Sequence, residues 1–594
     1  MFIRSVICLA SFCGALGVYG SVGAQTAPND PRVRDTPFES GAGNVSEGLI
    51  PKTGSDVNCS LTQDNFQNAV EQGASDPNAF VVNSVRVLAP EGGSELEQLD
   101  LINERLSKYI GFKTNLDGLK AIAVEAQCAI RSSGNLLSAV RVPAQTFDSD
   151  SADIELRLIL GRISSVDYIF DGQKIPDDLS ASLLTGSQKR AISRVKSRFS
   201  KLLDQNYESN ADLERAVLLA SRVPGIAVRP TLRKSDGGAE GAIALTVDIF
   251  EFDQFHGDVT LLNYSPESLG EWGPLLQLES RSLLAGGDNL VLSAYSSLDL
   301  ESQRVFRGAY SAPIGDSDWI GSIYGSYGVS EPGDDLTDIG LETESVIFGA
   351  DIRYPWKVGS RFQADIYAGV EKVSQDLTVL ETDISEDRLS VGYLGVEGYY
   401  ALPRVFSYYD LQIRQGANVF GASNSGDTNV SRIGANPSAT VVRANLQSTT
   451  RVANGLELST RISGQFSSDP LLAYEEFTVG NFTIGRGYEP GQLSGDSALG
   501  GAAEINFKNF DLGSGDGGLD ISVQPYIFGD AVQVWNEDQF SENRFVFSYG
   551  AGLKLEVAEN VVTDVVYAQA ERRVFSFSEE APGGSILVRT SLKF

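Results

Sequence analysis

The chain has 594 residues, enough for several domains, so its length sets no limit on the size of its core. Lys and Arg total 47 against 78 Asp and Glu, and a formal net charge of −31 argues against a general basic surface and therefore against nucleic acid as a partner. The single histidine, His256, and the lack of clustered Cys and His leave little for catalysis or metal ligation, so we expect no enzyme activity, no cofactor and no metal.

Residues 1–24 are predicted to be an export signal, because a basic start is followed by a short apolar run and a site of small residues. No later segment reaches the ~18 apolar residues that a membrane-spanning helix needs, so a membrane role would have to be built from strands. Residues 25–77 are rich in Pro, Gly and polar residues and indicate a linker, with at most one short helix at Thr62–Gln72. Two cysteines follow the signal, Cys59 and Cys128. In an exported protein we favour a disulfide between them, and two separate buried thiols are the alternative.

Two small α/β units are predicted next, over residues 78–161 and 162–252. The first has the order strand, helix, helix, strand, strand, and the second repeats that order. In the first predicted helix, Ser94–Ile110, apolar residues fall three or four apart and share one face. These residues are Leu99, Ile102, Leu106 and Tyr109. The last strand of the same unit alternates apolar and charged residues, which predicts one buried side and one wet side.

Residues 253–594 lose the helical period and instead show many segments in which apolar and polar residues alternate. Such alternation also occurs in a secreted β-sandwich, so one alternating strand does not distinguish a sandwich from a membrane barrel. Charged residues in mid-strand, aromatic residues near strand ends and more than 300 residues without a long helix together favour a membrane barrel. The apolar face would meet lipid and the charged face a wet lumen. The final strand carries Leu592 and Phe594 on one face, a pattern that resembles the C-terminal assembly signal of outer-membrane barrels.

Three motifs, taken in order, resemble the transporters of two-partner secretion. The first two are similar to segments of that family's polypeptide-transport-associated (POTRA) domains: Val142, Pro143 and Gln145 in AVRVPAQTF, then Leu213, Glu214, Arg215, Pro224 and Gly225 in LERAVLLASRVPGIAV. The third is GRGYEPGQLSGD, in which Arg486, Gly487 and Tyr488 match an Arg-Gly-aromatic element in the family's long loop between strands eleven and twelve. Each motif is weak alone, and their order and spacing carry the resemblance.

The resemblance implies a β-rich fold class, in which two POTRA domains precede an antiparallel barrel of about 16 strands with a loop around residues 480–500 folded inward. It places the barrel in the outer membrane of a Gram-negative bacterium and the POTRA domains in the periplasm. The partners implied are a secreted β-helical exoprotein bound unfolded, outer-membrane lipid, and barrel assembly machinery and periplasmic chaperones during biogenesis. No long amphipathic segment precedes Phe80, so the N-terminal plug helix found in many members is in doubt here.

The same resemblance assigns a partner to the arginine of the loop. In the family a Phe-x-Asp element on the barrel wall receives this arginine, and Phe528 and Asp530 match that element. Where the family has a glycine two residues further on, this chain has Val532, so the local packing is expected to differ. We therefore expect Arg486 to pair with Asp530 and hold the loop in the pore, and a surface turn is the alternative.

Two other functions compete with an ATP-independent translocation pore. An assembly factor that inserts other barrels shares the loop motif but usually carries three or more periplasmic domains. A diffusion porin has no use for about 170 residues of ordered structure before the barrel. The sequence contains no GxxxxGK[ST] motif, which agrees with transport that does not consume ATP.

Overall fold

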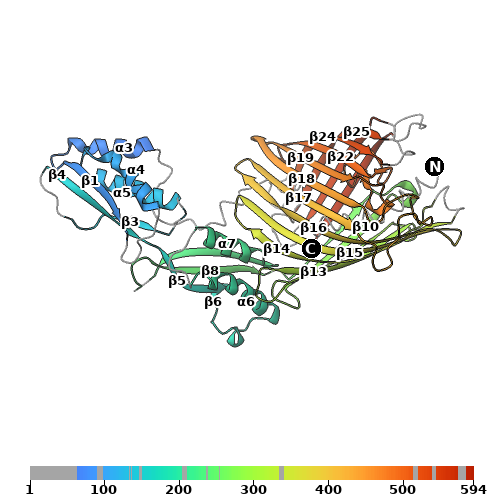
Figure 1. Ribbon diagram of the computed structural model, residues 1–594, viewed down its shortest axis with the longest axis horizontal. Helices are drawn as coiled ribbons and strands as arrows, with labels where there is room; N and C mark the ends of the chain where they lie inside the picture. The colour runs from blue at the N-terminus through green and yellow to red at the C-terminus, as the bar shows by residue number, and fades with distance from the viewer. Residues whose placement is uncertain are drawn as a thin grey trace.

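Two small α/β units and a closed β-barrel follow one another along the chain and lie in a row, with the first unit farthest from the barrel (Figure 1). The computed structural model describes residues 63–89, 98–132, 134, 137–145, 150–203, 210–235, 238–252, 254–333, 340–512, 520–537, 543–558, 560–572 and 583–594. Within these ranges, no helix is both long and apolar enough to cross a membrane.

The first unit packs three helices on a four-stranded sheet. Its helices are α3 (Gln63–Gln72), α4 (Gln98–Leu106) and α5 (Leu116–Ser132), and its strands are β1 (Phe80–Leu88), β2 (Lys113–Thr114), β3 (Ala139–Arg141) and β4 (Ser151–Ile159). The sheet order is β2-β1-β4-β3, with β1 parallel to β4. The face predicted for the first helix is the one that packs on the core: Ile102, Leu106 and Tyr109 are buried, and Leu99 packs beside them.

Helix α3 is the short helix that the sequence allowed at Thr62–Gln72, but it is packed against the first unit instead of lying free in a linker. Its Val70 is fully buried in the same core cluster as the first sheet, and the Thr114 hydroxyl donates a hydrogen bond to the Val70 carbonyl oxygen at 2.9 Å. The helix therefore packs as part of the first unit. Composition alone did not reveal this, because the segment has few apolar residues and their burial depends on α5. Helix α4 is also shorter than predicted, since a 3₁₀ turn at Ser107–Tyr109 ends it.

The second unit repeats the architecture with two helices. Its strands are β5 (Arg162–Phe170), β6 (Gln173–Lys174), β7 (Ile226–Lys234) and β8 (Ala242–Phe252), and its helices are α6 (Gly186–Ser200) and α7 (Asn210–Ser221). The sheet order is β6-β5-β8-β7, with β5 parallel to β8. A capping box fixes the start of α6, because Thr185 and Gln188 exchange side-chain to backbone hydrogen bonds. Strand β8 runs almost directly into the first barrel strand.

Sixteen antiparallel strands close the barrel, as the family resemblance implied, and β27 pairs with β9 to complete it. They are β9 (Phe255–Leu262), β10 (Gly273–Arg281), β11 (Asn289–Ser296), β12 (Gln303–Pro313), β13 (Ile320–Ser330), β14 (Leu341–Lys357), β15 (Phe362–Val379), β16 (Thr382–Leu402), β17 (Val405–Gly416), β18 (Thr440–Ala453), β19 (Leu456–Ser467), β22 (Ser497–Phe507), β24 (Ile521–Trp535), β25 (Arg544–Val557), β26 (Val561–Ala570) and β27 (Gly584–Lys593). The two-residue β23 (Phe510–Asp511) extends the edge of β24.

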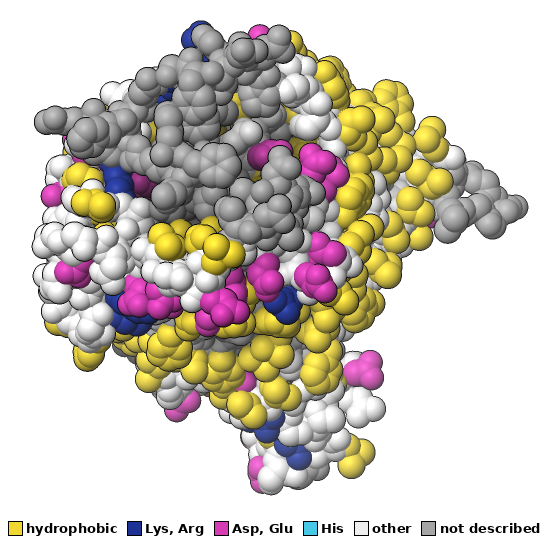
Figure 2. Space-filling model, turned by 90° about the vertical axis from the view of Figure 1, so that its right-hand side faces the viewer, with side chains coloured by type: hydrophobic (Ala, Val, Ile, Leu, Met, Phe, Trp, Pro, Cys, Tyr) yellow, Lys and Arg dark blue, Asp and Glu magenta, His cyan; other side chains and the backbone are white. Residues whose placement is uncertain are grey.

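Burial in the barrel is the reverse of that in a water-soluble protein. On β14 the apolar side chains of Val346, Phe348 and Trp356 are exposed on the outer wall, whereas Asp351 and Arg353 face inward and are buried. Figure 2 views the end of the molecule that lies at the right of Figure 1: hydrophobic side chains cover the outer wall and acidic side chains gather at the rim. An apolar exterior around a charged interior is the arrangement that a bilayer requires of a strand-built span.

The chain's last residue lies on this outer surface. The side chains of Leu592 and Phe594 are both exposed there, as the alternation of the final strand predicted. The backbones of Phe594 and Gly257 exchange two hydrogen bonds of 2.9 Å, and the aromatic ring lies over Gly257, where a Cβ atom would clash with it. Phe594 therefore extends the pairing of β27 with β9, which closes the barrel.

Candidate functional site

The segment between β19 and β22, residues 468–496, folds into the barrel, and we call it the lumen loop. It contains a 3₁₀ turn at Ala473–Glu475 and a small hairpin of β20 (Phe477–Val479) and β21 (Leu493–Gly495). Four of its apolar side chains form a buried cluster with inward-facing residues of β22, β24, β25 and β26. The loop contributes Val479, Ile484, Tyr488 and Leu493, and the wall contributes Ala498, Val532, Val534, Val546 and Ala570.

Arg486 of the lumen loop lies against Asp530, on β24. Its Nε and Nη2 atoms donate to the two carboxylate oxygens of Asp530 at 3.1 and 2.9 Å, which is a bidentate pair. The backbone N–H groups of Arg486 and Gly485 also donate to Asp530, at 2.9 and 3.3 Å. The Asp530 side chain is 1% exposed, so these donors, rather than water, stabilise its negative charge. The structure thus brings together the two residues that the resemblance paired.

A second carboxylate, which no sequence motif indicated, completes the surroundings of Arg486. The Nη1 atom donates to Glu504 on β22 at 2.8 Å, and Lys554 on β25 balances Glu504 at 2.7 Å. The guanidinium also lies 3.5 Å from the centre of the Phe528 ring, a cation–π contact. Strand register explains the geometry, because Glu504 is paired directly with Phe528 on the neighbouring strand. We call the contacts of Arg486 with Asp530 and Glu504 the Arg486 latch.

The next two residues of the motif seat the loop on the wall. A Cβ atom on Gly487 would lie 2.7 Å from the Ala570 nitrogen and 2.9 Å from the Ser548 Cβ, so only glycine fits. The Tyr488 hydroxyl lies 3.0 Å from the carbonyl oxygens of Phe547 and Arg572. Tyr488 is only 2% exposed, and it holds the loop against the ends of β25 and β26.

Val532 stands where the element that this chain resembles has a glycine. Its side chain is 1% exposed and packs in the cluster that contains Val479 and Ile484 of the lumen loop. A hypothetical Cβ on Gly500, on the adjacent β22, would lie 3.0 Å from Ile484 and 3.2 Å from Val532. The larger side chain at position 532 therefore fills space beneath the loop, and the small residue stands on the neighbouring strand.

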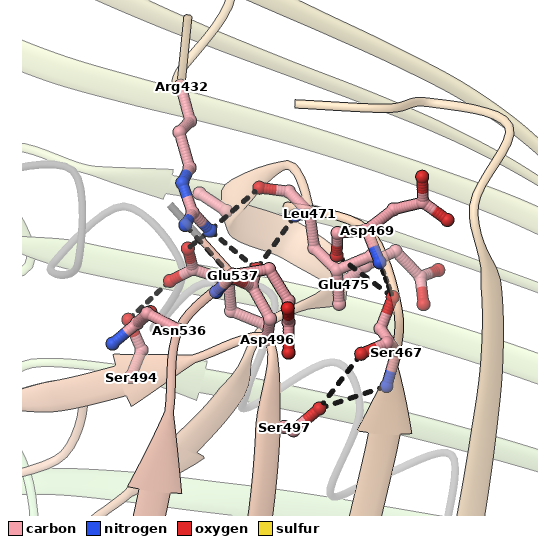
Figure 3. Close-up of polar contacts among 12 residues, drawn as sticks. Arg432, Ser467, Asp469, Leu471, Glu475, Ser494, Asp496, Ser497, Asn536 and Glu537 are labelled. Carbon is pink, nitrogen blue, oxygen red and sulfur yellow. Dashed lines mark hydrogen bonds and ion pairs between the residues drawn. The ribbon is translucent and has the colours of Figure 1, made fainter. Parts of the chain in front are cut away.

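The base of the lumen loop is closed by a further ion pair, which the sequence did not suggest. Arg432, in the connection between β17 and β18, donates two hydrogen bonds to Asp496 at 2.5 and 3.0 Å and a third to Glu476 at 2.8 Å (Figure 3). The Asp496 carboxylate also accepts the backbone N–H groups of Leu471 and Glu537 at 2.7 and 2.8 Å. Both limbs of the loop are therefore drawn together where it leaves the wall.

The second unit contacts two turns at its end of the barrel through the part of the motif that lies on α7. Glu214 accepts the backbone N–H of Ser360 at 2.6 Å, and Arg215 donates to Asp318 at 2.9 Å. Asp318 lies in the turn between β12 and β13 and also pairs with Arg198 of α6. Burial pushes the pKa of Asp318 upward, but the two arginines outweigh it and hold that pKa below its ordinary value.

The neighbouring helix α6 adds to the same interface. Arg194 donates to the carbonyl oxygens of Gly315, at 2.8 Å, and Ser317. Burial, with a smaller contribution from nearby Arg198, lowers the pKa of Arg194 to about 10, so it remains charged at neutral pH. Arg190 donates to the Leu283 carbonyl oxygen at 2.6 Å. The helices of the second unit thus present a row of cations to backbone carbonyls and one carboxylate of the barrel turns.

The other residues of this motif have structural positions. Leu213 is buried in the core of the second unit. Pro224 is also buried, and its carbonyl oxygen lies 3.5 Å from the Ser282 hydroxyl of the β10–β11 turn. Gly225 has φ of +74°, a conformation that favours glycine after the helix.

The motif of the first unit closes the edge of its sheet. The Gln145 side chain donates to the Glu155 carbonyl oxygen and accepts the Glu155 N–H, each at 3.0 Å. It therefore continues the ladder beyond β3, where the chain would otherwise leave β4. Val142 packs against the core of the unit, and the next residue, Pro143, is half-buried.

The cysteine prediction falls partly outside the described residues. Cys128, in α5, is disulfide-bonded, and Cys59 lies outside the part of the chain that the structure describes. Across the described ranges, no group of three or more His, Cys, Asp and Glu side chains is placed to hold a metal ion.

Known proteins share this architecture. CdiB from Escherichia coli superposes with a TM-score of 0.67 at 14% identity, over 89% of this chain and 95% of that chain. CdiB from Acinetobacter baumannii gives a TM-score of 0.63 at 14% identity, over 92% and 95%. No curated protein sequence matches the chain.

The family comparison confirms the resemblance that the motifs carried. Residues 241–555, more than half of the chain, match the family described as haemolysin secretion/activation protein ShlB/FhaC/HecB. That match begins one residue before β8 of the second unit and extends through most of the barrel, including the lumen loop. The chain therefore belongs to the ShlB/FhaC/HecB family, and it is an outer-membrane transporter of the two-partner secretion type whose partner is a secreted exoprotein.

Proposed function

We propose that this transporter receives its exoprotein unfolded in the periplasm and passes it through the barrel without ATP. In this proposal the exoprotein is β-helical, and the two α/β units are periplasmic POTRA domains that recognise it. The observation that carries the proposal is the Arg486 latch, because a loop held in the lumen by side-chain ion pairs and hydrogen bonds can be released without dismantling the strands of the wall. Outer-membrane lipid covers the apolar exterior, and barrel assembly machinery and periplasmic chaperones serve its biogenesis.

Recognition of an unfolded chain requires backbone contacts that tolerate many sequences. Strand β7 offers them: among the described residues it pairs only with β8, which leaves a nine-residue edge at the side of the second sheet. A captured segment would add to this edge as a further strand, with alternate side chains supplying selectivity. The first sheet offers less, since its edge strands β2 and β3 have two and three residues.

The interface between the second unit and the barrel supports delivery into the pore. Arg190 and Arg194 of α6 fix the unit on the turns of β10–β11 and β12–β13, and Glu214 of α7 fixes it on the β14–β15 turn. A segment bound at this unit is therefore held beside the barrel entrance. Net movement would come from outside the cell, where folding of the emerged exoprotein prevents it from sliding back.

The test pairs this gene with a neighbouring gene for a long, signal-bearing β-helical repeat protein. Deletion of the transporter is expected to remove that protein from the medium and to leave it, or its degradation products, in the periplasm. Complementation with the wild-type chain restores export and serves as the control. Unchanged export in the deletion strain would refute the assignment of this partner class.

A further inference from the structure

A buried ion cluster of the opposite polarity holds the first limb of the lumen loop. The carboxylate of Glu475 accepts two hydrogen bonds from Arg414 on β17, at 2.6 and 3.2 Å, and one from Arg443 on β18, at 2.9 Å. The exposed fractions of these side chains are 6% for Glu475, 5% for Arg414 and 21% for Arg443. At Arg486 the loop supplies the cation and the wall the anions, whereas here the loop supplies the anion and the wall the cations.

The cluster is charge-balanced only while Glu475 is in place. Arg414 also pairs with Glu371 of β15 at 2.7 Å, so two arginines face two carboxylates. The Tyr324 hydroxyl donates to Glu371 at 2.8 Å, and the carbonyl oxygen of Glu475 accepts the Gln465 side chain at 2.8 Å. Removing the charge of Glu475 would leave Arg443, whose side chain is 21% exposed, without the carboxylate that it pairs with in the closed state.

The loop reaches from this cluster to the opposite wall. Beyond Glu475 it passes Asn481, whose side chain donates to the Tyr264 carbonyl oxygen at 3.0 Å, and Phe482, whose ring lies 5.4 Å from that of Tyr264. Tyr264 follows β9, the first strand, and Arg414 lies on β17, the ninth of sixteen. Strands eight places apart in a barrel of sixteen lie across a diameter. The loop therefore spans the pore, with Glu475 at one end and Asn481 at the other.

We propose that Glu475 is a positioning residue for gating: a second latch, opposite in polarity to Arg486, that fixes the near end of the loop across the pore. This inference rests on the proposed function, because it assigns a role to a residue within the same translocation path. Arg432 closes the base of the loop at Glu476 and Asp496, but with Arg486 as the only latch beyond that base the loop can still swing about it. Held at Glu475 as well, it crosses the lumen as a strut, and passage of a polypeptide requires release of the Glu475 end too.

The test compares Glu475→Gln with wild type in planar lipid bilayers, where channel opening is measured without any exoprotein. Glutamine keeps the size and part of the hydrogen bonding but loses the charge, and we expect open-channel occupancy to rise about tenfold. The control is Glu489→Gln, the same change at an exposed carboxylate of the same loop for which no ion pair is seen among the described residues. Glu475→Asp keeps the charge on an arm too short to reach both arginines as Glu475 does, and it is expected to raise opening above wild type by less than Glu475→Gln does.

Barrel assembly is measured in the same preparations by the heat-dependent shift of the folded barrel in electrophoresis. Assembled Glu475→Gln protein that opens no more often than wild type would overturn the inference. If that variant does not assemble, Glu475→Asp decides: increased opening supports the second latch, and wild-type opening refutes it. Secretion by the wild-type chain, measured separately, shows whether the proposed function holds whatever the channel result.

Discussion

Replacing Arg486 by alanine is expected to open the pore while leaving the barrel folded. In the closed state the change removes three charge-assisted hydrogen bonds, two to Asp530 and one to Glu504, and the contact with the Phe528 ring. The two carboxylates are 1% and 3% exposed, so they would be left buried with less compensation. With the loop released, both would face the wet lumen, and the cost therefore falls on the closed state.

The size of the effect follows from the donors that remain. Loss of one partner of a buried ion pair costs about 3–5 kcal/mol. Glu504 keeps Lys554 at 2.7 Å and Asp530 keeps two backbone N–H groups, so we expect the lower end, about 3 kcal/mol. At about 1.4 kcal/mol for each factor of ten, the closed state would lose about 100-fold in relative population.

The assay is single-channel recording of purified protein in planar bilayers, together with electrophoresis that separates folded from unfolded barrels. Arg486→Lys is expected to lie between alanine and wild type, because an ammonium keeps the charge but cannot make the bidentate pair. Arg404→Ala, at an exposed arginine in the β16–β17 turn, is the matched control. A folded Arg486→Ala barrel with wild-type conductance would refute the latch, and failure of the barrel to fold would make the arginine purely structural.

Three further changes test other contacts. Gly487→Val is expected to unseat the loop and raise conductance as Arg486→Ala does, because its Cβ would come within 2.7 Å of the Ala570 nitrogen; wild-type closure would contradict the close approach. The pKa of Asp318 is lowered in the folded protein. Its ionised carboxylate therefore stabilises the interface fully above the ordinary aspartate pKa of about 3.9, and this stabilisation is lost as the pH falls through the lowered pKa. Hydrogen exchange at the β12–β13 turn should show this acid opening, and Asp318→Asn should abolish it. Gln145→Ala should destabilise the first unit by about 1–2 kcal/mol, seen as faster exchange of the amide that Gln145 accepts; unchanged exchange would show that the bond contributes nothing.

Some features of the protein could be predicted because they repeat over a few residues. The alternation along β14 fixed which side chains face lipid, and the spacing of Ile102, Leu106 and Tyr109 fixed the buried face of the first unit's helix. Both patterns depend on backbone geometry within one element, so neither needs knowledge of the fold. The Arg-Gly-Tyr motif likewise directed attention to Arg486, although its pairing with Asp530 came from the resemblance.

Other features depended on residues that are distant in sequence and meet only when the barrel closes. Glu504 looked like any other lumen carboxylate, and it becomes a ligand of Arg486 because register places it beside Phe528. Helix α3 looked like linker because its burial is supplied by α5. Glu475 showed no signal at all, since the arginines that bind it stand on two strands that precede the loop.

The sequence by itself determined a barrel built from strands, the lipid-facing side of strands such as β14, the two α/β units and the family. The tertiary structure alone decided which charges pair, because an ion pair depends on strand register and on the path of a loop through the lumen, and neither leaves a local period. Arg486 and Glu475 are eleven residues apart in the chain, yet barrel closure gives one of them two carboxylates and the other two arginines. The same loop is thereby held by opposite charges at two places in one pore.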